Sequence, residues 1–527
     1  MPGVNQKYVL AIDLGTGGPK VGLVDVHGRV VASAFERNEV IFLPNGGAEQ
    51  DANQWWQSVL RASKKVIREA GVPAESIVAV GCTAMWSVTV AVDDHGEPLM
   101  NALSWMDHRG APYNKEISRG FPSVEGYAVG KLINWIRLGG IVPTHTGSDS
   151  LGHMLFIKHE RPEIYQRTYK FLEPLDFINM RLTGKAAASQ STVFPMVMTD
   201  NRRPDCRAYD PWLVGASGID PEKLPELLPN DGVVGPLAPS VASELGLSPN
   251  TVVIVGAFDN HTSAIGSGAV QDYEAVAVLG SSGHLACHVP FKRTDLSSFI
   301  TTMPSPLRGR YLIFGDLGNN GDVLDSYLRN QIYFKSSFNS QGAPSDVYER
   351  MNQVAEQAPV GSGGLLFLPW FNGILCPRDD PAMRGGFLNL SHQTTGAHMT
   401  RAVLEGTAYN WRWLLGSAEK FVGRKFSYLR LAGGGAQSDT WAQIMADVTG
   451  LPIHQMADPR NGNVLGIALL AFNRLDLVAI DEIPGLVKIA HVFQPRQENR
   501  AVYDKLFGQF MACQKTLKPI FHALNGS

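Results

Sequence analysis

The segment DLGTGGPK, Asp13 to Lys20, has the residue types and spacing of a phosphate-binding turn. An apolar stretch precedes Asp13, so a strand would deliver the carboxylate just before Gly15, Gly17 and Gly18 turn the chain. Glycines let backbone N–H groups approach phosphate oxygens, Lys20 can add positive charge, and the carboxylate can hold Mg²⁺ through water. The same glycines would also suit an ordinary hairpin. The P-loop pattern GxxxxGK[ST] does not occur in the sequence, nor does GxGxxG at a strand-to-helix turn.

Two further glycine-rich turns could also face a nucleotide. LGSSG (279–283) offers two hydroxyls that can donate to phosphate, although an isolated motif of this kind is more often a plain turn. AGGGAQS (432–438) runs from a buried strand toward a helix. Three consecutive glycines carry a high entropic cost, so either a tight strand-to-helix turn or a flat ligand against the backbone must require them.

An acidic residue, Asp259, ends the very apolar strand predicted in VIVGAFDNHTSAIG (253–266). Aspartate is a favoured N-cap, so one interpretation is that it caps the helix that follows. The other is a general base that accepts the proton of an attacking hydroxyl, as phosphoryl transfer often requires. The sequence leaves both open.

The elements that would position these residues form an α/β pattern. Residues 8–15, 20–28 and 29–35 predict three strands, and residues 76–84 predict a buried strand. A helix is expected from Asp51, as its N-cap, to Gly71. A second hairpin is predicted over 88–105, around Asp94 to Gly96.

A similar set of parts recurs in the second half of the chain. Residues 273–289 repeat the order of apolar strand, glycine-rich turn and strand, which indicates an internal duplication. A helix over 398–421, a strand over 428–433 and a helix over 439–450 follow. We therefore expect two α/β lobes with mixed sheets, residues 1–265 and 266–527, with the boundary uncertain by about ten residues.

The composition excludes several classes of protein. The 527 residues are 44% hydrophobic with a net charge of −3, so the chain should fold throughout and lacks the positive field that nucleic acid or an anionic membrane requires. The five cysteines are scattered and form no CxxC pair. No apolar stretch approaches the length of a membrane span, and the N-terminus lacks a signal-type apolar region. We expect a cytoplasmic protein with small-molecule ligands, and a homodimer is compatible with the sequence.

Taken in order, these segments resemble the FGGY family of carbohydrate kinases, in particular its xylulose-kinase-like branch. Four motifs in register are a stronger signal than any single one, and the similarity covers nearly the whole chain. The connecting segments that carry it are EQDANQWWQSV (49–59), LSWMDHR (103–109), RPEIYQRTYKFLEPLDFINMRLTG (161–184), RAVLEGTAYNWR (401–412) and LAGGGAQSDTWAQIMADVTG (431–450).

The resemblance implies two ribonuclease-H-like lobes of the actin and hexokinase type, with a catalytic cleft between them. It implies that Asp259 is the catalytic base and that Asp13 holds Mg²⁺. The ATP-binding residues would be Asp13, Gly15, Thr16, Gly17, Lys20, Gly280, Ser281, Ser282 and Gly283 at the phosphates, with Gly433, Gly434 and Gly435 at the adenosine. The candidate sugar-binding residues are Met85, Trp86, Asp107, Arg109 and Asn260. Trp86 could stack on the C–H face of a sugar or could belong to the core, and the polar Asp107 and Arg109 are the better candidates for sugar hydroxyls.

The function implied is ATP-dependent phosphorylation of a small sugar, with a ketopentose such as xylulose expected. The alternatives are a kinase of another polyol (tetritol, pentitol or hexitol) and a non-catalytic sugar or nucleotide sensor. Three segments depart from the family pattern. DxGTTS reads DLGTGG, GERxP reads GILCP (373–377), and Met85-Trp86 stands where xylulose kinases carry Met-His and glycerol kinases Arg-Glu. The resemblance therefore extends further on the ATP side than on the sugar side.

Overall fold

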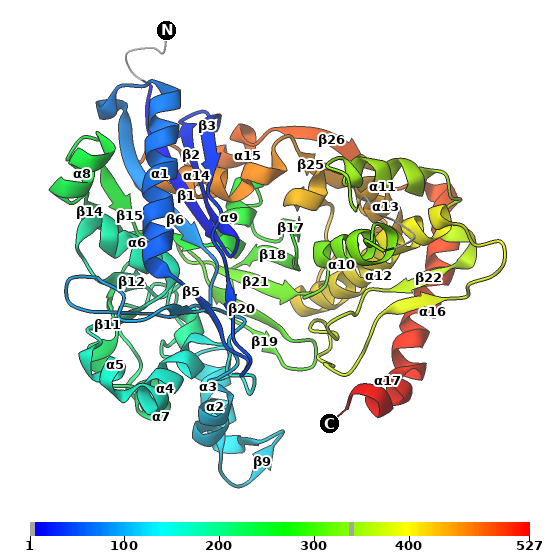
Figure 1. The fold of residues 1–527 in the computed structure, drawn as a ribbon, viewed down its shortest axis with the longest axis horizontal. Coiled ribbons are helices and arrows are strands. Elements are labelled where there is room, and N and C mark those ends of the chain that lie inside the picture. The colour runs from blue at the N-terminus through cyan, green and yellow to red at the C-terminus, as the bar shows by residue number, and fades with distance from the viewer. Residues whose placement is uncertain (1–5, 337–341, 527) are drawn as a thin grey trace.

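The computed structural model describes residues 6–336 and 342–526. It places them in two α/β lobes that lie side by side, each built around its own large sheet (Figure 1). We call the lobe that contains the N-terminal sheet the first lobe and the other the second lobe. This is the two-lobed mixed α/β architecture predicted from the sequence.

The sheet of the first lobe has seven strands in the order β14-β15-β6-β1-β2-β3, with β16 also paired to β6. Helix α1 (Ala52–Ala70) packs against β2 and β3. Asp51 caps α1 by accepting from the N–H groups of Asn53 and Gln54, and Gly71 ends it with φ 59°, both as predicted. The strands are β1 (Tyr8–Gly15), β2 (Gly18–Asp25), β3 (Val30–Phe35), β6 (Ile77–Ala84), β14 (Val233–Pro236), β15 (Val252–Ile254) and β16 (Ala257–Phe258).

The sheet of the second lobe has eight strands in the order β19-β20-β21-β18-β17-β24-β25-β26. Helices α12 (Gly396–Val422) and α13 (Asp439–Thr449) pack against one another beside it. The strands are β17 (Ala275–Leu279), β18 (Gly283–Val289), β19 (Thr294–Asp295), β20 (Ile300–Pro304), β21 (Tyr311–Asp316), β24 (Leu429–Ala432), β25 (Ile453–Met456) and β26 (Ile489–Phe493).

The two sheets repeat one topology, as the internal duplication predicted. The path β3-β2-β1-β6-β15-β14 has the same sequence of antiparallel and parallel pairings as β21-β18-β17-β24-β25-β26. The β1–β2 turn therefore corresponds to the β17–β18 turn. The two glycine-rich motifs occupy equivalent places in the two lobes.

Two helices join the lobes, because each packs against the sheet of the other lobe. Helix α9 (Asp259–Gly266) contacts β17 and β18, and α14 (Gly462–Arg474) contacts β1, β2 and β6. The helices cross at glycine. A Cβ atom on Gly266 would lie 1.9 Å from the Gly462 carbonyl oxygen, and one on Gly466 would lie 2.0 Å from the Thr262 carbonyl oxygen. Only glycine permits this approach.

The hairpin predicted over 88–105 forms only in part. Its turn is present, with the Asp93 N–H donating to the Glu97 carbonyl. However, β7 (Val90–Val92) pairs with β11 (Lys170–Leu172), and β8 (Ala102–Leu103) pairs with β5 (Ala48–Gln50). Only isolated bridges join the two predicted arms, because each short strand finds its main backbone partner in another segment.

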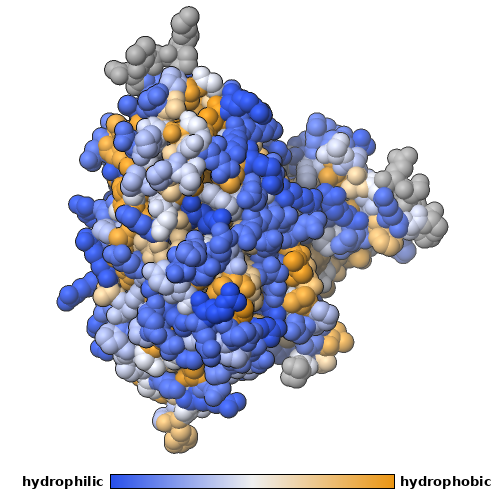
Figure 2. Space-filling view, turned by 60° about the vertical axis from the view of Figure 1, so that its left-hand side comes forward, coloured by the Kyte–Doolittle hydropathy of each residue, from blue (hydrophilic) through white to orange (hydrophobic). Residues whose placement is uncertain are grey.

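The remaining elements cover the sheets and form the outer parts of both lobes. None of the helices in residues 6–336 and 342–526 is long and apolar enough to cross a membrane. Figure 2 shows a largely hydrophilic face with small, separate apolar patches. The elements are β4 (Ile41–Phe42), α2 (Ala111–Ser118), β9 (Ser123–Val124), β10 (Tyr127–Ala128), α3 (Val129–Leu138), α4 (Ser150–Glu160), α5 (Pro162–Arg167), α6 (Pro174–Thr183), β12 (Ala187–Ser189), α7 (Pro211–Ser217), β13 (Glu226–Leu228), α8 (Pro239–Leu245), α10 (Gly321–Ser326), α11 (Val347–Glu356), β22 (Leu366–Leu368), β23 (Gly386–Leu388), α15 (Ile483–Leu486), α16 (Arg500–Thr516) and α17 (Lys518–Asn525).

Candidate active site

Asp13 and Asp259 come together near the carboxyl ends of β1 and β16, which pair in parallel with opposite edges of β6. In the β1–β6 pair, Asp13 lies opposite Thr83, and in the β16–β6 pair Phe258 lies opposite Ala84. Burial and the charge of Asp13 raise the pKa of Asp259 to about 7. Burial raises the pKa of Asp13 to about 6, although Lys20 and Asn463 act in the opposite direction. Two carboxyl groups with raised pKa values at adjacent strand ends are typical of a catalytic site.

Asp259 does not cap the helix that follows it, so the capping interpretation is wrong. Helix α9 begins at Asp259 itself, and its N-cap residue is Phe258, without a side-chain cap hydrogen bond. Within the described residues, the buried Oδ1 atom of Asp259 has no hydrogen-bond partner. The neighbouring Asn260 is 4% exposed, and its Oδ1 atom also lacks a partner there. Both oxygens are left to accept hydrogen bonds from a ligand.

The first glycine-rich turn is a tight hairpin between β1 and β2, with Gly15 paired to Gly18. Gly18 has φ 123°, and a Cβ there would lie 2.1 Å from the Glu36 carbonyl oxygen. Thr16 accepts a hydrogen bond from the Trp105 indole N–H at 3.1 Å. Lys20 donates to the Arg460 carbonyl oxygen, which belongs to the second lobe. The hairpin interpretation is thus correct for the backbone, and it leaves the tip available to phosphate.

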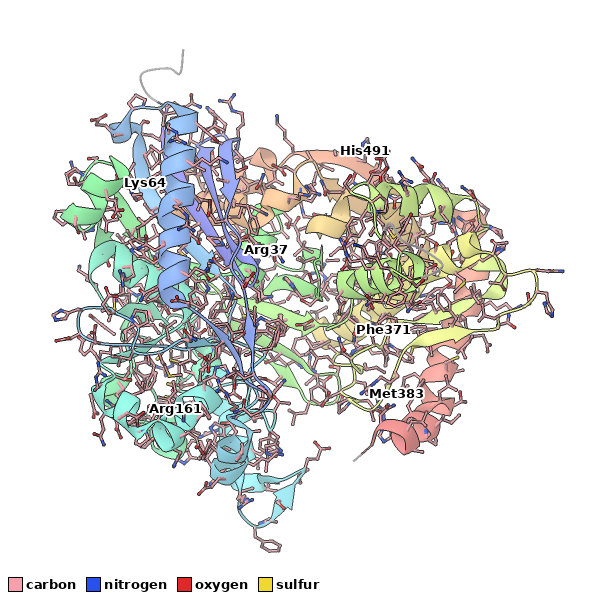
Figure 3. The ribbon with its side chains drawn as sticks, viewed as in Figure 1. Arg37, Lys64, Arg161, Phe371, Met383 and His491 are labelled. Carbon is pink, nitrogen blue, oxygen red and sulfur yellow. The ribbon has the colours of Figure 1, made fainter. Side chains whose placement is uncertain are left out.

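Side chains around this turn add one cation that the sequence analysis did not single out. Asn38 donates its backbone N–H to the Gly17 carbonyl oxygen, so the chain after β3 runs beside the turn. Arg37 precedes it and is exposed. In Figure 3, Arg37 lies on the side of the first lobe that faces the second lobe. Phe371 is labelled in the second lobe. A surface arginine carries no local sequence signal that would distinguish it.

The second glycine-rich turn, between β17 and β18, is held by the segment that begins α10. The Gly321 N–H donates to the Gly280 carbonyl oxygen at 3.0 Å, and the Asp322 N–H donates to the Ser281 carbonyl oxygen at 3.0 Å. The Asn320 side chain adds a third bond to Gly280 at 3.1 Å. The turn is therefore fixed in shape before any ligand binds.

The three glycines of the third turn, residues 433–435, differ in the space around them. A Cβ on Gly433, whose φ is 86°, would lie 2.8 Å from the Leu279 carbonyl oxygen, and one on Gly435 would lie 2.5 Å from the Trp441 ring. Close packing against the end of β17 therefore explains both glycines. Nothing lies within 4 Å of a Cβ on Gly434. Gly434 is the glycine of the three whose bare backbone faces open space.

On the sugar side, Met85 and Trp86 directly follow β6. The Met85 sulfur contacts the Thr16 hydroxyl at 3.4 Å. The Trp86 ring stacks on Phe194 at 6.2 Å and meets Phe314 of β21 edge-on at 4.9 Å. Trp86 thus contacts aromatic rings from both lobes.

Asp107 and Arg109 pair with each other. The guanidinium of Arg109 contacts Asp107 at 2.6 Å and Glu49 at 2.7 Å, and the Ala48 N–H donates to Asp107 at 3.0 Å. Burial alone would raise the pKa of Asp107, but the hydrogen bonds from Arg109 and Ala48 hold it below its usual value. Their direct contact with sugar stays a prediction.

Asp316, the last residue of β21, is a further acidic residue of this region that was not predicted from the sequence. Like Asp13, it follows an apolar run within its strand, and that shared pattern was the available signal. Its charge contributes to the raised pKa of Asp259. In the described part of the chain, no group of three or more His, Cys, Asp or Glu side chains is arranged to hold a metal by itself.

Comparison with known proteins agrees with this geometry. Residues 8–266 match the N-terminal domain and residues 275–474 the C-terminal domain of the FGGY family of carbohydrate kinases. The chain therefore belongs to the FGGY family, and it is a carbohydrate kinase. It is 27% identical to a xylulose kinase of Bacillus subtilis over 95% of each chain, and 25% identical to a gluconokinase of Bacillus licheniformis over 97% of this chain and 96% of the relative.

The fold is that of solved carbohydrate kinases. The structure of ligand-bound xylulose kinase from Lactobacillus acidophilus superimposes with a TM-score of 0.84, at 24% identity, over 98% of this chain and all of the other. This likeness establishes the fold alone.

Proposed function

We propose that this kinase transfers the γ-phosphate of ATP to a hydroxyl of a ketopentose, with xylulose the first substrate to test. The observation that carries the proposal is the buried Oδ1 of Asp259, which lies near Asp13 and has no hydrogen-bond partner among the described residues. The relatives named xylulose kinase, which match over almost their full length, support the choice of sugar.

The proposed base is Asp259, which would orient the acceptor hydroxyl and take its proton. The turn with Gly15, Thr16, Gly17 and Lys20 and the turn from Gly280 to Gly283 would contact the phosphates, and the bare backbone at Gly434 would border the adenosine. The two turns belong to the proposed lobes 1–265 and 266–527. A phosphoryl group held from both sides is positioned by fixed donors rather than by water.

The donor set fits Mg²⁺. Asp13 offers a hard carboxylate oxygen and stands beside a second carboxylate, whose charge a cation would offset. Mg²⁺ usually binds through one or two carboxylates, several waters and substrate phosphates, so an all-protein cluster is not required. Bound there, it would supply charge neutralisation at the transferring phosphate. We propose that Asp13 holds it.

On the acceptor side, we propose that Asn260 accepts a hydroxyl hydrogen bond and that Trp86 packs against the C–H face of the sugar. Met85 would border the same space, and Asp107 and Arg109 would shape its edge. Tetritols, pentitols and hexitols are the alternative acceptors. Glycerol is not expected to be the preferred one, because Met85 and Trp86 cannot pair with its few hydroxyls as charged side chains would.

The test is a coupled ADP-release assay with a panel of pentuloses, pentitols, tetritols, hexitols, gluconate and glycerol. We expect the highest kcat/KM with a ketopentose. A higher value for a pentitol, tetritol or hexitol would move the assignment to that polyol. A higher value for glycerol would overturn the interpretation of Met85 and Trp86.

A further inference from the structure

Asp316 and His284 face one another across the β18–β21 pair of the second lobe. The antiparallel register sets His284 opposite Asp316 and Ala286 opposite Phe314. Because side chains alternate along a strand, these four lie on one face of the sheet. Phe314 and Ala286 pack in the cluster shared with the first lobe, whereas Ile313 and Leu285 pack in the core of the second lobe. Asp316 and His284 therefore face the first lobe.

Contacts join this pair to the proposed acceptor pocket. The His284 Nε2 atom lies 3.4 Å from the hydroxyl of Ser263, one helical turn beyond Asp259 on α9. Two residues before Asp316, the ring of Phe314 contacts Trp86 at 4.9 Å. The pair thus lies on the second-lobe side of the space that Asp259 and Trp86 border from the first lobe.

The chemistry of the pair suits uncharged hydroxyl groups. One oxygen of Asp316 accepts from the Gly318 N–H at 2.7 Å, which fixes the carboxylate, and no ion pair to Asp316 occurs among the described residues. Burial lowers the pKa of His284 to about 4, so its ring is neutral near pH 7 and can donate as well as accept. A carboxylate beside a neutral imidazole can form hydrogen bonds with two neighbouring hydroxyl groups of a sugar.

Arg109, the cation among the proposed sugar-side residues, is already held by Asp107 and Glu49. The charges of Asp13 and Asp316 both raise the pKa of Asp259, so both carboxyl groups lie near it. A substrate carboxylate placed against Asp316 would meet a like charge that no ion pair among the described residues offsets, and such like-charge contact is costly.

We propose that Asp316 and His284 bind hydroxyl groups of the acceptor, and that this kinase accepts uncharged sugars or polyols and rejects aldonates such as gluconate. This inference rests on the proposed function and narrows its substrate class. It also distinguishes this chain, by its substrate class, from the relatives named gluconokinase. Those relatives match the chain over almost the same length as the relatives named xylulose kinase.

The test compares wild type with Asp316→Asn and His284→Ala by steady-state kinetics and by calorimetric binding of xylulose and gluconate. A hydrogen bond to a charged group contributes about 1.5–3 kcal/mol, so Asp316→Asn should raise the KM and Kd for xylulose by about 10-fold or more. His284→Ala should raise both by about 3-fold or more. The KM for ATP should change less than about 2-fold in each. The matched control is Asp325→Asn, which removes the same charge from the exposed side of α10, where Asp325 pairs with Arg329.

The outcomes separate the inference from the function on which it rests. If xylulose gives ADP release but its KM and Kd are unchanged in Asp316→Asn, the inference is wrong and the function stands. If xylulose binds and its binding weakens in Asp316→Asn without ADP release, the function is wrong and the inference stands. Phosphorylation of gluconate by wild type as efficient as that of xylulose would overturn the substrate class. No binding of any uncharged sugar would overturn both.

Discussion

Asp13 and Asp259 reach the same point from opposite edges of β6, one at the end of β1 and the other just after β16. The charge of Asp13 is the second cause, after burial, of the raised pKa of Asp259. The two acids therefore have to be considered as one electrostatic unit, in which a change at one alters the other.

The first prediction concerns Asp259→Asn, which keeps the shape of the side chain but cannot accept a proton. Turnover should fall by a factor on the order of 10² to 10⁴ while the KM for ATP changes little. Folding should stay intact, because Asp259 makes no cap hydrogen bond to lose. ADP release and circular dichroism would check this. Turnover within a few-fold of wild type would show that Asp259 is not the base.

The second prediction is that the same substitution stabilises the protein at high pH. The folded pKa of Asp259 is raised from 3.8 to about 7, so the folded state prefers the protonated acid. The free energy of unfolding that this carboxyl contributes is greatest below pH 4 and is lost as the pH rises through 7. Asparagine is neutral throughout. Asp259→Asn should therefore exceed wild type in stability at pH 8 by on the order of 4 kcal/mol, with a smaller difference at pH 5.

Denaturant unfolding of both proteins at pH 5 and pH 8 measures this difference. Comparing variant with wild type cancels the contributions of groups that do not interact with Asp259, and it includes the change that the substitution causes in the titration of Asp13 and Asp316. Equal stability of the two proteins at pH 8 would mean that Asp259 ionises without cost in the folded state.

The third prediction concerns the contact between the lobe-joining helices. In Gly466→Ala, the new methyl group would lie 2.0 Å from the Thr262 carbonyl oxygen, so α9 and α14 must move apart. Such overpacking should cost about 1–3 kcal/mol and, because α9 carries Asp259, should also lower kcat. The control is Gly416→Ala in α12, where a methyl group meets nothing within 4 Å. That variant should be neutral or more stable by up to about 1 kcal/mol. Equal unfolding midpoints for the two variants would refute the close-packing argument.

The fourth prediction is that ligands close the lobes. The two phosphate turns belong to different lobes, so bound triphosphate and sugar should favour the arrangement in which both turns reach them. Small-angle scattering with a non-hydrolysable ATP analogue, magnesium and xylulose should give a smaller radius of gyration than the free protein. If the radius is unchanged while calorimetry shows both ligands bound, the cleft is preformed.

Local sequence was sufficient to predict features that depend on neighbouring residues. Asp51 and Gly71 delimit α1 because capping and left-handed geometry are properties of a few consecutive residues. Glycine clusters at strand ends predicted the three turns for the same reason. The repeat of apolar strand, turn and strand also predicted the duplicated sheets, since each copy carries its own periodicity.

Only the tertiary structure decided what those residues contact. It showed that Asp259 does not cap α9, that Asp107 is paired with Arg109, and that His284 faces Asp316. Each depends on which strands are neighbours and in what register, which long-range packing determines. The raised pKa of Asp259, and the lack of a partner for its Oδ1 atom among the described residues, are likewise properties of its surroundings, because the segments that bury it and the charge of Asp13 are distant in the chain.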